Sequence, residues 1–332
     1  MRSITIACAA AIVLGMTACN ARSPVAYGDA NAIIVLADDS LWAAVGDSMH
    51  SVMEPQVFTV RNERMFELTH VSPADPAWAK LREWKQVLVI GRADDPWVAD
   101  VTNGAVVSDL PAIYEKADIW ARGQRVTAVI LPDEEVERAV IDLLPELHEF
   151  FASRFRQGVL ERMFVSGANT ARRDSLRAHA GFAILLPNVY TYSRLGEAHR
   201  FLNANRAAGD RVDRSIVVMW RNGATPLTAD QLRAWRDSLG THAYEWGQMV
   251  DRNQMRSRAL ESYADGSIEV QGVWLGTDPT FPMAGPFLSR AIVCPTQNRT
   301  YLIDAFLYAP ARDKYEYILQ LQTILDSFEC GS

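Results

Sequence analysis

The chain has 332 residues, of which 49% are hydrophobic and 22% charged, and its formal net charge is −7. This composition excludes an intrinsically disordered protein, and the length allows a buried core in each of two domains. An acidic chain without a basic binding motif is not expected to bind nucleic acid.

The first residues have the pattern of a secretory signal. Arg2 supplies a positive charge, an apolar run follows over residues 4–16, and small residues precede Cys19. The apolar run is too short for a stable membrane-spanning helix. Residues 1–18 are therefore expected to be a cleaved signal peptide.

The end of this signal, Met16-Thr17-Ala18-Cys19, resembles the bacterial lipobox, in which the cysteine is acylated and becomes the mature N-terminus. The alternative is an ordinary cleaved signal with an incidental cysteine. Asn20 follows Cys19, so the Asp that favours retention in the inner membrane is absent. The sequence predicts a lipid anchor at Cys19, a polar tether over residues 19–30, and a place on the periplasmic face of the outer membrane.

Charge is distributed unevenly along the chain. Residues 154–214 hold eleven Arg and five acidic residues, whereas residues 19–153 hold eleven basic and twenty-two acidic residues. The basic middle would suit lipid headgroups or another anionic envelope polymer. The alternative is a solvated face of surface ion pairs.

The first half alternates apolar runs with helical patterns. LWAAVGDSMHSV (41–52) has its apolar residues at helical spacing after a capping cluster at Asp38. The other expected elements are a strand in AIIVLADDS (32–40), a hairpin in QVFTVRNERMFELTHV (56–71) turning at Asn62, strands in KQVLVIG (85–91) and WARGQRVTAVILP (120–132), and a long helix in DEEVERAVIDLLPELHEFFASRF (133–155) bent at Pro145.

The second half also alternates strand-like apolar runs with helical patterns. Thr228 and Gly240 bracket a helix in TADQLRAWRDSLG, and DKYEYILQLQTILDSF (313–328) predicts the last helix. Strands are expected in GFAILLP (181–187), RSIVVMWRNG (214–223), SIEVQGVWLG (267–276), LSRAIVCP (288–295) and RTYLIDAFLYAP (299–310).

Both halves end as a strand that runs into Pro and then an acidic helix start. We therefore expect two related α+β domains, each a mostly antiparallel sheet packed against helices. The first covers residues 31–165 and the second residues 166–332, with the junction in SGANTARRD (166–174).

The C-terminal third carries a family resemblance. Its motifs are Gly272-Val273-Trp274, Ala284-Gly285-Pro286-Phe287 and Tyr308-Ala309-Pro310, followed by the last helix. Together they resemble the bacterial lipoprotein family catalogued as domain of unknown function 4837. Val273 replaces the family's Leu and Ala284 its Gly.

Upstream, Ile119-Trp120-Ala121 with Gln124 and the pair Arg236-Asp237 extend this resemblance over most of the mature chain. The resemblance implies a lipoprotein with an α+β fold and brings no established activity. More weakly, the late strand and helix are similar to the small sandwich of the PsbP and Mog1 type, which consists of binding or assembly modules.

Gly46-Asp47-Ser48 matches the nucleophile block of GDS(L) hydrolases. That chemistry needs the Ser just after a strand and a late Asp-x-x-His to supply the base, and no histidine beyond this block has an Asp at that spacing. We therefore expect Ser48 in a packed helix, with Leu41, Val45, Met49 and Val52 buried.

Metal and cofactor motifs are absent from the sequence. It contains no His-x-x-x-His, Cys-x-x-Cys, calcium loop or glycine-rich phosphate loop, so no metal and no cofactor are expected. Once the signal is removed and Cys19 acylated, Cys294 and Cys330 remain. In an oxidising periplasm they either pair as a disulfide or stay as two unrelated thiols.

The best candidate for a ligand or partner surface is the apolar turn from Pro279 to Phe287, which contains FPMAGPF (281–287). Pro and Gly would fix such a loop at little entropic cost, with Trp274 and Arg290 beside it. The alternative is a rigid connection packed into the core. The candidate surface comprises Trp274, Pro282, Gly285, Pro286, Phe287 and Arg290.

The sequence thus favours a non-enzymatic binding or assembly module of the cell envelope, without catalytic residues. Its expected partners are the membrane, through the N-terminal lipid, and an envelope protein or ligand. The alternative is a periplasmic hydrolase with dispersed acid/base residues, to be sought first at Asp237 and Glu245 with Arg236.

Overall fold

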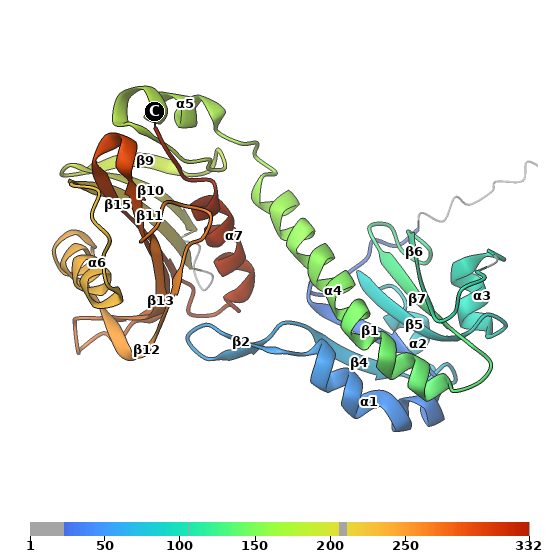
Figure 1. Ribbon diagram of the computed structural model, residues 1–332. Helices are drawn as coiled ribbons and strands as arrows, with labels where there is room; N and C mark the ends of the chain where they lie inside the picture. Colours follow the sequence, from blue (N-terminus) through green and yellow to red (C-terminus); the bar gives the residue numbers. More distant parts are fainter. Residues whose placement is uncertain (1–22, 106, 206–210, 332) are drawn as a thin grey trace, which may run out of the picture.

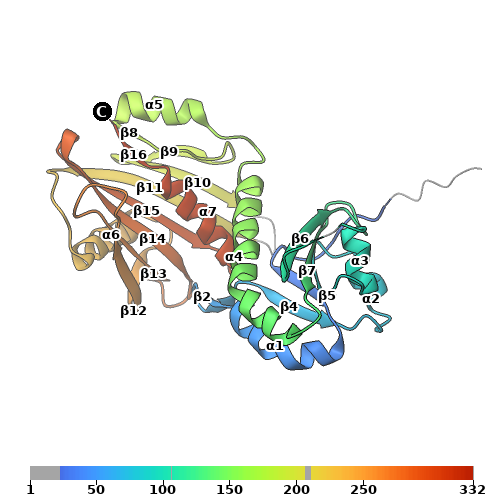
Figure 2. The same cartoon turned by 45° about the vertical axis from the view of Figure 1, so that its right-hand side comes forward.

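A computed structural model describes residues 23–331 of the chain, except residue 106 and residues 206–210. The expected signal peptide and the expected lipidation site, Cys19, lie outside these described residues. Figures 1 and 2 show two α+β domains side by side, with the long helix α4 (Val136–Met163) between them. The prediction of a two-domain α+β protein is confirmed.

The first domain is built on a sheet of strand order β4-β1-β5-β7-β6. Helices α1 and α4 cover one face of this sheet, and α2 and α3 lie against the other. The strands are β1 (Ala32–Leu36), β4 (Glu67–Val71), β5 (Gln86–Arg92), β6 (Ala112–Ala117) and β7 (Arg125–Leu131), and the shorter helices are α1 (Asp39–Met53), α2 (Trp78–Leu81) and α3 (Pro96–Thr102).

In this domain the expected antiparallel sheet is wrong. Strand β1 pairs in parallel with β4 and β5, β5 pairs in parallel with β7, and only the edge strand β6 runs antiparallel. The physical reason is burial on both faces, which gives continuous apolar runs such as AIIVL and VLVI instead of alternation. The second domain has a different strand order and direction, so the suggested relation between the halves does not extend to their topology.

The second domain contains one antiparallel sheet of order β12-β13-β14-β15-β11-β10-β9. Helix α6 packs on one face, and α5 and α7 pack on the other. The strands are β9 (Thr191–Leu195), β10 (Ala198–Asn205), β11 (Val212–Asn222), β12 (Gln248–Ala259), β13 (Ile268–Gly276), β14 (Ala284–Cys294) and β15 (Arg299–Tyr308); the helices are α5 (Thr170–Ala180), α6 (Ala229–Ala243) and α7 (Tyr315–Asp326).

Local signals explain several of these elements. Thr228 begins α6 with a capping box completed by Gln231, although the helix continues three residues beyond the expected stop at Gly240. The strand expected over residues 181–187 is reduced to β8 (Phe182–Ala183), which pairs with β16 (Glu329–Cys330), and η1 (Pro295–Gln297) joins β14 to β15.

A hairpin of the first domain reaches the second. Strands β2 (Gln56–Phe58) and β3 (Asn62–Arg64) form an antiparallel hairpin that turns at residues 59–61 and not at Asn62 as expected, and it projects from the first domain toward the second-domain sheet (Figure 1). The rest of the expected hairpin forms β4, which pairs in parallel with β1. Glu63 is buried there, and its Oε2 accepts hydrogen bonds from the backbone N–H groups of Lys314 (2.7 Å) and Tyr315 (3.1 Å) at the start of α7. The first domain therefore supplies the N-terminal cap of a second-domain helix.

The start of the described chain is fixed to the first domain from Pro24 onward. The backbone N–H of Arg122 donates to Pro24 O, that of Ala26 donates to Arg122 O, and that of Lys85 donates to Tyr27 O. We call residues 24–28 the docked segment. The tether expected over residues 19–30 is thus shorter than predicted, because its second half is bonded to two loops of the first domain.

Candidate functional site

The candidate surface around residues 281–287 lies mostly in the interior. Trp274, Phe287 and Arg290 are 0–1% exposed, and Gly285 and Pro286 are also buried, whereas Pro282 is exposed. These five residues belong to β13 and β14, inner strands of a sheet that is covered on both faces. They do not form an exposed partner surface, and the alternative of a rigid connection packed into the core describes them.

Close packing explains the Gly and Trp of this motif. The indole Nε1 of Trp274 donates to Leu307 O at 3.1 Å. A Cβ added at Gly285 would lie 2.0 Å from the same carbonyl oxygen, so no other residue fits. The motif that carries the family resemblance is therefore a packing motif.

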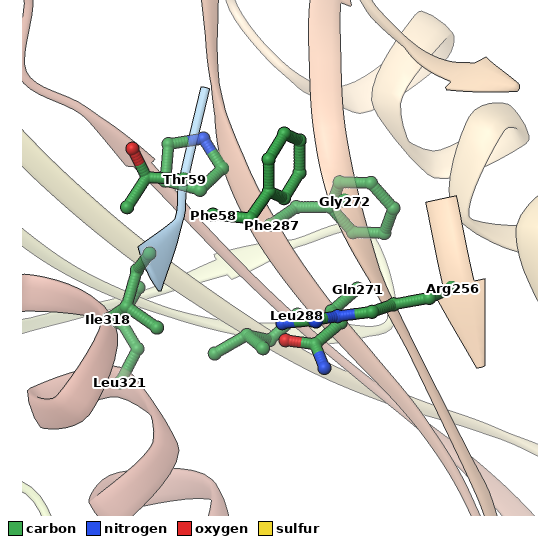
Figure 3. Close-up of a pocket in the computed structure, with 10 residues that line it drawn as sticks. Phe58, Thr59, Arg256, Gln271, Gly272, Phe287, Leu288, Ile318 and Leu321 are labelled. Carbon is green, nitrogen blue, oxygen red and sulfur yellow. The ribbon is translucent and has the colours of Figure 1, made fainter. Parts of the chain in front are cut away.

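Phe287 also lies beside the hairpin tip. Figure 3 shows Phe58 and Thr59 of the first domain facing Phe287, with Ile318 and Leu321 of α7 nearby. The space between them is about 20 Å³, which is room for a single water molecule. This gap is a contact between domains and has no room for a ligand.

The residues proposed for a hydrolase do not share one accessible site. Arg236 is fully buried, donates to Gln248 Oε1 at 2.6 Å and forms an ion pair with Asp304. The Asp237 carboxylate accepts from the backbone N–H of Val250 at 2.8 Å and pairs with Arg233 at 2.8 Å. Glu245 is exposed beyond the end of α6.

Ser48 lies in the middle of α1, as the helical spacing predicts. Val45 and Met49 are fully buried, and Leu41 and Val52 pack against the same core while partly exposed. Asp38 caps the helix, because its carboxylate accepts from the backbone N–H of Ser40. Strand β1 ends twelve residues before Ser48, which is a residue of a packed helix and not of a turn that directly follows a strand.

The two cysteines of the second domain are paired. Cys294 and Cys330 form a disulfide with Cα atoms 6.0 Å apart, which joins the end of β14 to β16. Among residues 23–331, apart from the six undescribed positions, no group of three His, Cys, Asp or Glu side chains is placed to hold a metal ion. In the same part of the chain no helix is both long and apolar enough to cross a bilayer.

An open hollow of about 570 Å³ in the second domain gathers basic side chains. The end of α5, strands β9, β10 and β11, and the start of β15 form its walls. We call it the arginine pocket; its polar and aromatic lining residues are Arg177, His179, Arg194, His199, Trp220, Gln297 and Arg299.

Two of its arginines lack an acidic partner. In the described part of the chain, no carboxylate forms an ion pair with Arg194 or Arg299, whereas Arg177 pairs with Glu329. Arg299 lies over the ring of Trp220 at 4.7 Å and donates to Ala180 O at 3.2 Å, at the end of α5. The hollow therefore has a net positive charge that the protein itself does not neutralise.

His199 organises one wall of the arginine pocket. Burial, together with the positive charge of Arg194, lowers the pKa of His199 from 6.5 to about 4. The imidazole is therefore neutral at pH 7 and accepts from Arg194 Nη1 at its Nε2 (2.6 Å). Its Nδ1–H then donates to the hydroxyl of Tyr192 (3.0 Å), so both ring nitrogens are used to orient Arg194.

Sequence reasoning missed this pocket. Arg177, Arg194, His199, Trp220 and Arg299 are spread over more than 120 positions and several elements, so no local motif joins them. The one signal was the basic charge of residues 154–214, which supply Arg177, Arg194 and His199. Within that stretch, surface pairs such as Arg173 with Asp174 also occur, in line with the alternative of a solvated face.

Comparison with known families places both domains. Residues 169–327 match the family model described as Domain of unknown function (DUF4837). The second domain is a DUF4837 domain. Residues 26–165 match another model, Domain of unknown function (DUF8532), so the upstream motif at Trp120 and Gln124 falls outside the DUF4837 match. Neither description assigns an activity or a ligand.

Other comparisons add little to the DUF4837 assignment. No curated protein matches the chain. Among the similar solved structures is the Ran-binding protein Mog1p of Saccharomyces cerevisiae, at 11% identity and a TM-score of 0.32. Another is a Mog1 mutant, at 11% identity and a TM-score of 0.31. Each match covers 45% of this chain and 90% of the Mog1 chain.

Proposed function

We propose that this protein is a non-enzymatic, lipid-anchored binding protein of the cell envelope, and that the arginine pocket holds an anionic group of its ligand. The observation that carries the proposal is the pair of guanidinium groups, Arg194 and Arg299, that line an open hollow without acidic partners. The N–H groups of a guanidinium match the spacing of two oxygens in a planar carboxylate or a tetrahedral phosphate.

The chemistry of the pocket favours binding over catalysis. His199 is its most buried ionisable residue, and it stays neutral with both ring nitrogens engaged. A general base needs a free lone pair near its substrate. The hydrolase alternative has less support, because Arg236 and Asp237 are committed to contacts within the fold.

The envelope location has separate support. The lipobox-like residues end at Cys19, and Asn20 favours the outer membrane, on its periplasmic face. The pair Cys294–Cys330 fits an oxidising compartment, where structural disulfides persist.

Binding of anionic probes tests the pocket. We expect inorganic tripolyphosphate or citrate to bind the wild-type protein in isothermal titration at low salt, and Arg194→Gln to weaken the binding at least about ten-fold, since a hydrogen bond to a charged group contributes about 1.5–3 kcal/mol. Arg252→Gln is the matched control, because Arg252 is exposed on β12 at the opposite edge of the sheet. Equal affinity of wild type and Arg194→Gln, or no binding of either probe, would contradict the proposal.

Metabolic labelling tests the anchor. Cells that express the wild-type precursor with a palmitate analogue should yield a labelled protein in the membrane fraction. Cys19→Ala should abolish the label, because the thiol is the acyl acceptor. Labelling of Cys19→Ala at the wild-type level would exclude this cysteine as the lipid site.

A further inference from the structure

The docked segment fixes where the chain leaves the first domain. Its first bonded residue is Pro24, whose carbonyl oxygen accepts from the backbone N–H of Arg122 at 2.8 Å. In Figure 2 the N-terminal blue segment starts on the side of the first domain that faces away from the second domain. A lipid on Cys19 would therefore attach the molecule from this side.

The connection between lipid and domain is short. Five residue steps separate Cys19 from Pro24. At about 3.5 Å per residue, a fully extended chain spans about 17 Å over this stretch. Side chains around the docked segment thus stay within reach of the headgroup layer.

Four basic residues with exposed side chains lie on the backbone segments around the docked segment. Lys85 donates its backbone N–H to Tyr27 O, and the carbonyl of Lys80 accepts from the Tyr27 hydroxyl at 2.9 Å. Arg82 and Arg122 belong to the same two loops, which Gln124 joins through its bonds to Arg82 O and to Trp84 O (2.8 Å). We call Lys80, Arg82, Lys85 and Arg122, with Val25 and Trp84, the anchor-side face.

The charge of this face departs from that of its domain. Residues 19–153 carry twice as many acidic as basic residues, yet four of their eleven basic residues are on the anchor-side face. No ion pair in the described residues involves any of the four. The same loops contain two acidic residues, Asp118 and Glu83. The Asp118 carboxylate accepts a hydrogen bond from the backbone N–H of Gly123 at 2.6 Å.

Apolar and aromatic groups complete the face. Val25 is 60% exposed, and the half-buried Trp84 ring lies 5.7 Å from the ring of Tyr27. Trp, Tyr, Lys and Arg are the residues that favour the interface between lipid and water. The composition is complementary to an anionic membrane surface.

We infer that the anchor-side face lies against the anionic headgroups of the membrane that holds Cys19, which fixes the orientation of the first domain on the bilayer. The inference rests on the lipid anchor of the proposed function and is independent of the ligand in the arginine pocket. With the first domain held in this way, the second domain extends away from the attachment side (Figure 2).

Vesicle co-sedimentation tests the inference without the lipid. The protein is the mature chain, residues 19–332 with Cys19→Ala, and the vesicles contain phosphatidylcholine with or without 30% phosphatidylglycerol. Binding should require the anionic lipid. Lys85→Gln with Arg122→Gln should weaken it about 25-fold, or about five-fold for each charge removed. Both side chains are exposed and make no hydrogen bond among the described residues, so the fold should be retained.

Two controls locate the contact. Arg92→Gln with Arg138→Gln removes two exposed charges elsewhere on the same domain and should change the affinity less than two-fold. Arg194→Gln should bind vesicles normally while losing the anionic probes, which separates this inference from the pocket. Equal binding to neutral vesicles, an equal loss in the control pair, or a loss confined to Arg194→Gln would each overturn the anchor-side face as the membrane contact.

Discussion

Asp304→Asn should destabilise the protein by about 3–5 kcal/mol, because it leaves the buried guanidinium of Arg236 without a counter-charge. Both side chains are 0% exposed, with Arg236 Nε 3.5 Å from Asp304 Oδ1. The same carboxylate accepts from the hydroxyl of Tyr244 at 2.5 Å and from that of Ser289. Burial, reinforced by the charge of Asp304, raises the pKa of Tyr244 well above 10, so this phenol remains a donor.

Urea unfolding followed by circular dichroism measures the loss. The control is Asp142→Asn on α4, where both partners of the Arg138–Asp142 pair are exposed. Such a surface pair contributes about 0.2–1 kcal/mol, so its loss should be small. If Asp304→Asn cost no more stability than Asp142→Asn, another group would have to compensate the charge of Arg236. The ion pair with Asp304 would then not be what stabilises this buried guanidinium.

Loss of the disulfide should destabilise the second domain by about 4 kcal/mol, because the unfolded chain then regains the entropy of an open loop of 36 residues. Cys294 and Cys330 are 36 residues apart, and Cys294 is 1% exposed in the core. The double substitution Cys294→Ala with Cys330→Ala should lower the melting temperature. Dithiothreitol should do the same to the wild type and leave the double variant unchanged.

The chemistry of the thiols provides the check. The protein, purified and unfolded without reductant, should show no reactive thiol from Cys294 or Cys330, and two after reduction. Because residues 23–163 contain no cysteine, reductant should not change the unfolding of the first domain. Two free thiols in the native protein purified without reductant would contradict the pairing.

In the second domain the sequence predicted four of the seven sheet strands and helices α6 and α7, and in the first domain it predicted most strands but not their direction. Helical spacing located α6 and α7, and Thr228 marked a start that the capping box confirms. Strand direction in the first domain was missed, because parallel pairing leaves no local turn signal and depends on crossover helices. Strands β9, β10 and β12 were missed because Arg, Asn and His interrupt their apolar alternation.

The site was harder to predict for a similar reason. Proline, glycine and aromatic residues around Phe287 suggested an exposed loop, but a central strand needs the same residue types where β13, β14 and β15 pack closely. The arginine pocket depends on which strands become neighbours: β9, β10 and β11 bring together Arg194, His199 and Trp220. Which strands pair in a sheet is a long-range property of the fold. Of the arginine pocket, the composition therefore showed only the net positive charge of residues 154–214.

The cap that Glu63 gives to α7 also sets an order of events in folding. Glu63 lies near the start of the chain and Lys314 follows it by 251 residues, so this contact forms only after nearly the whole chain has emerged. The first domain, which emerges first, holds a carboxylate whose two backbone donors on α7 do not yet exist. Docking of the last helix therefore forms the contacts between Glu63 and the start of α7. A chain arrested before residue 314 would leave Glu63 without these two donors and the hairpin without its contact to α7.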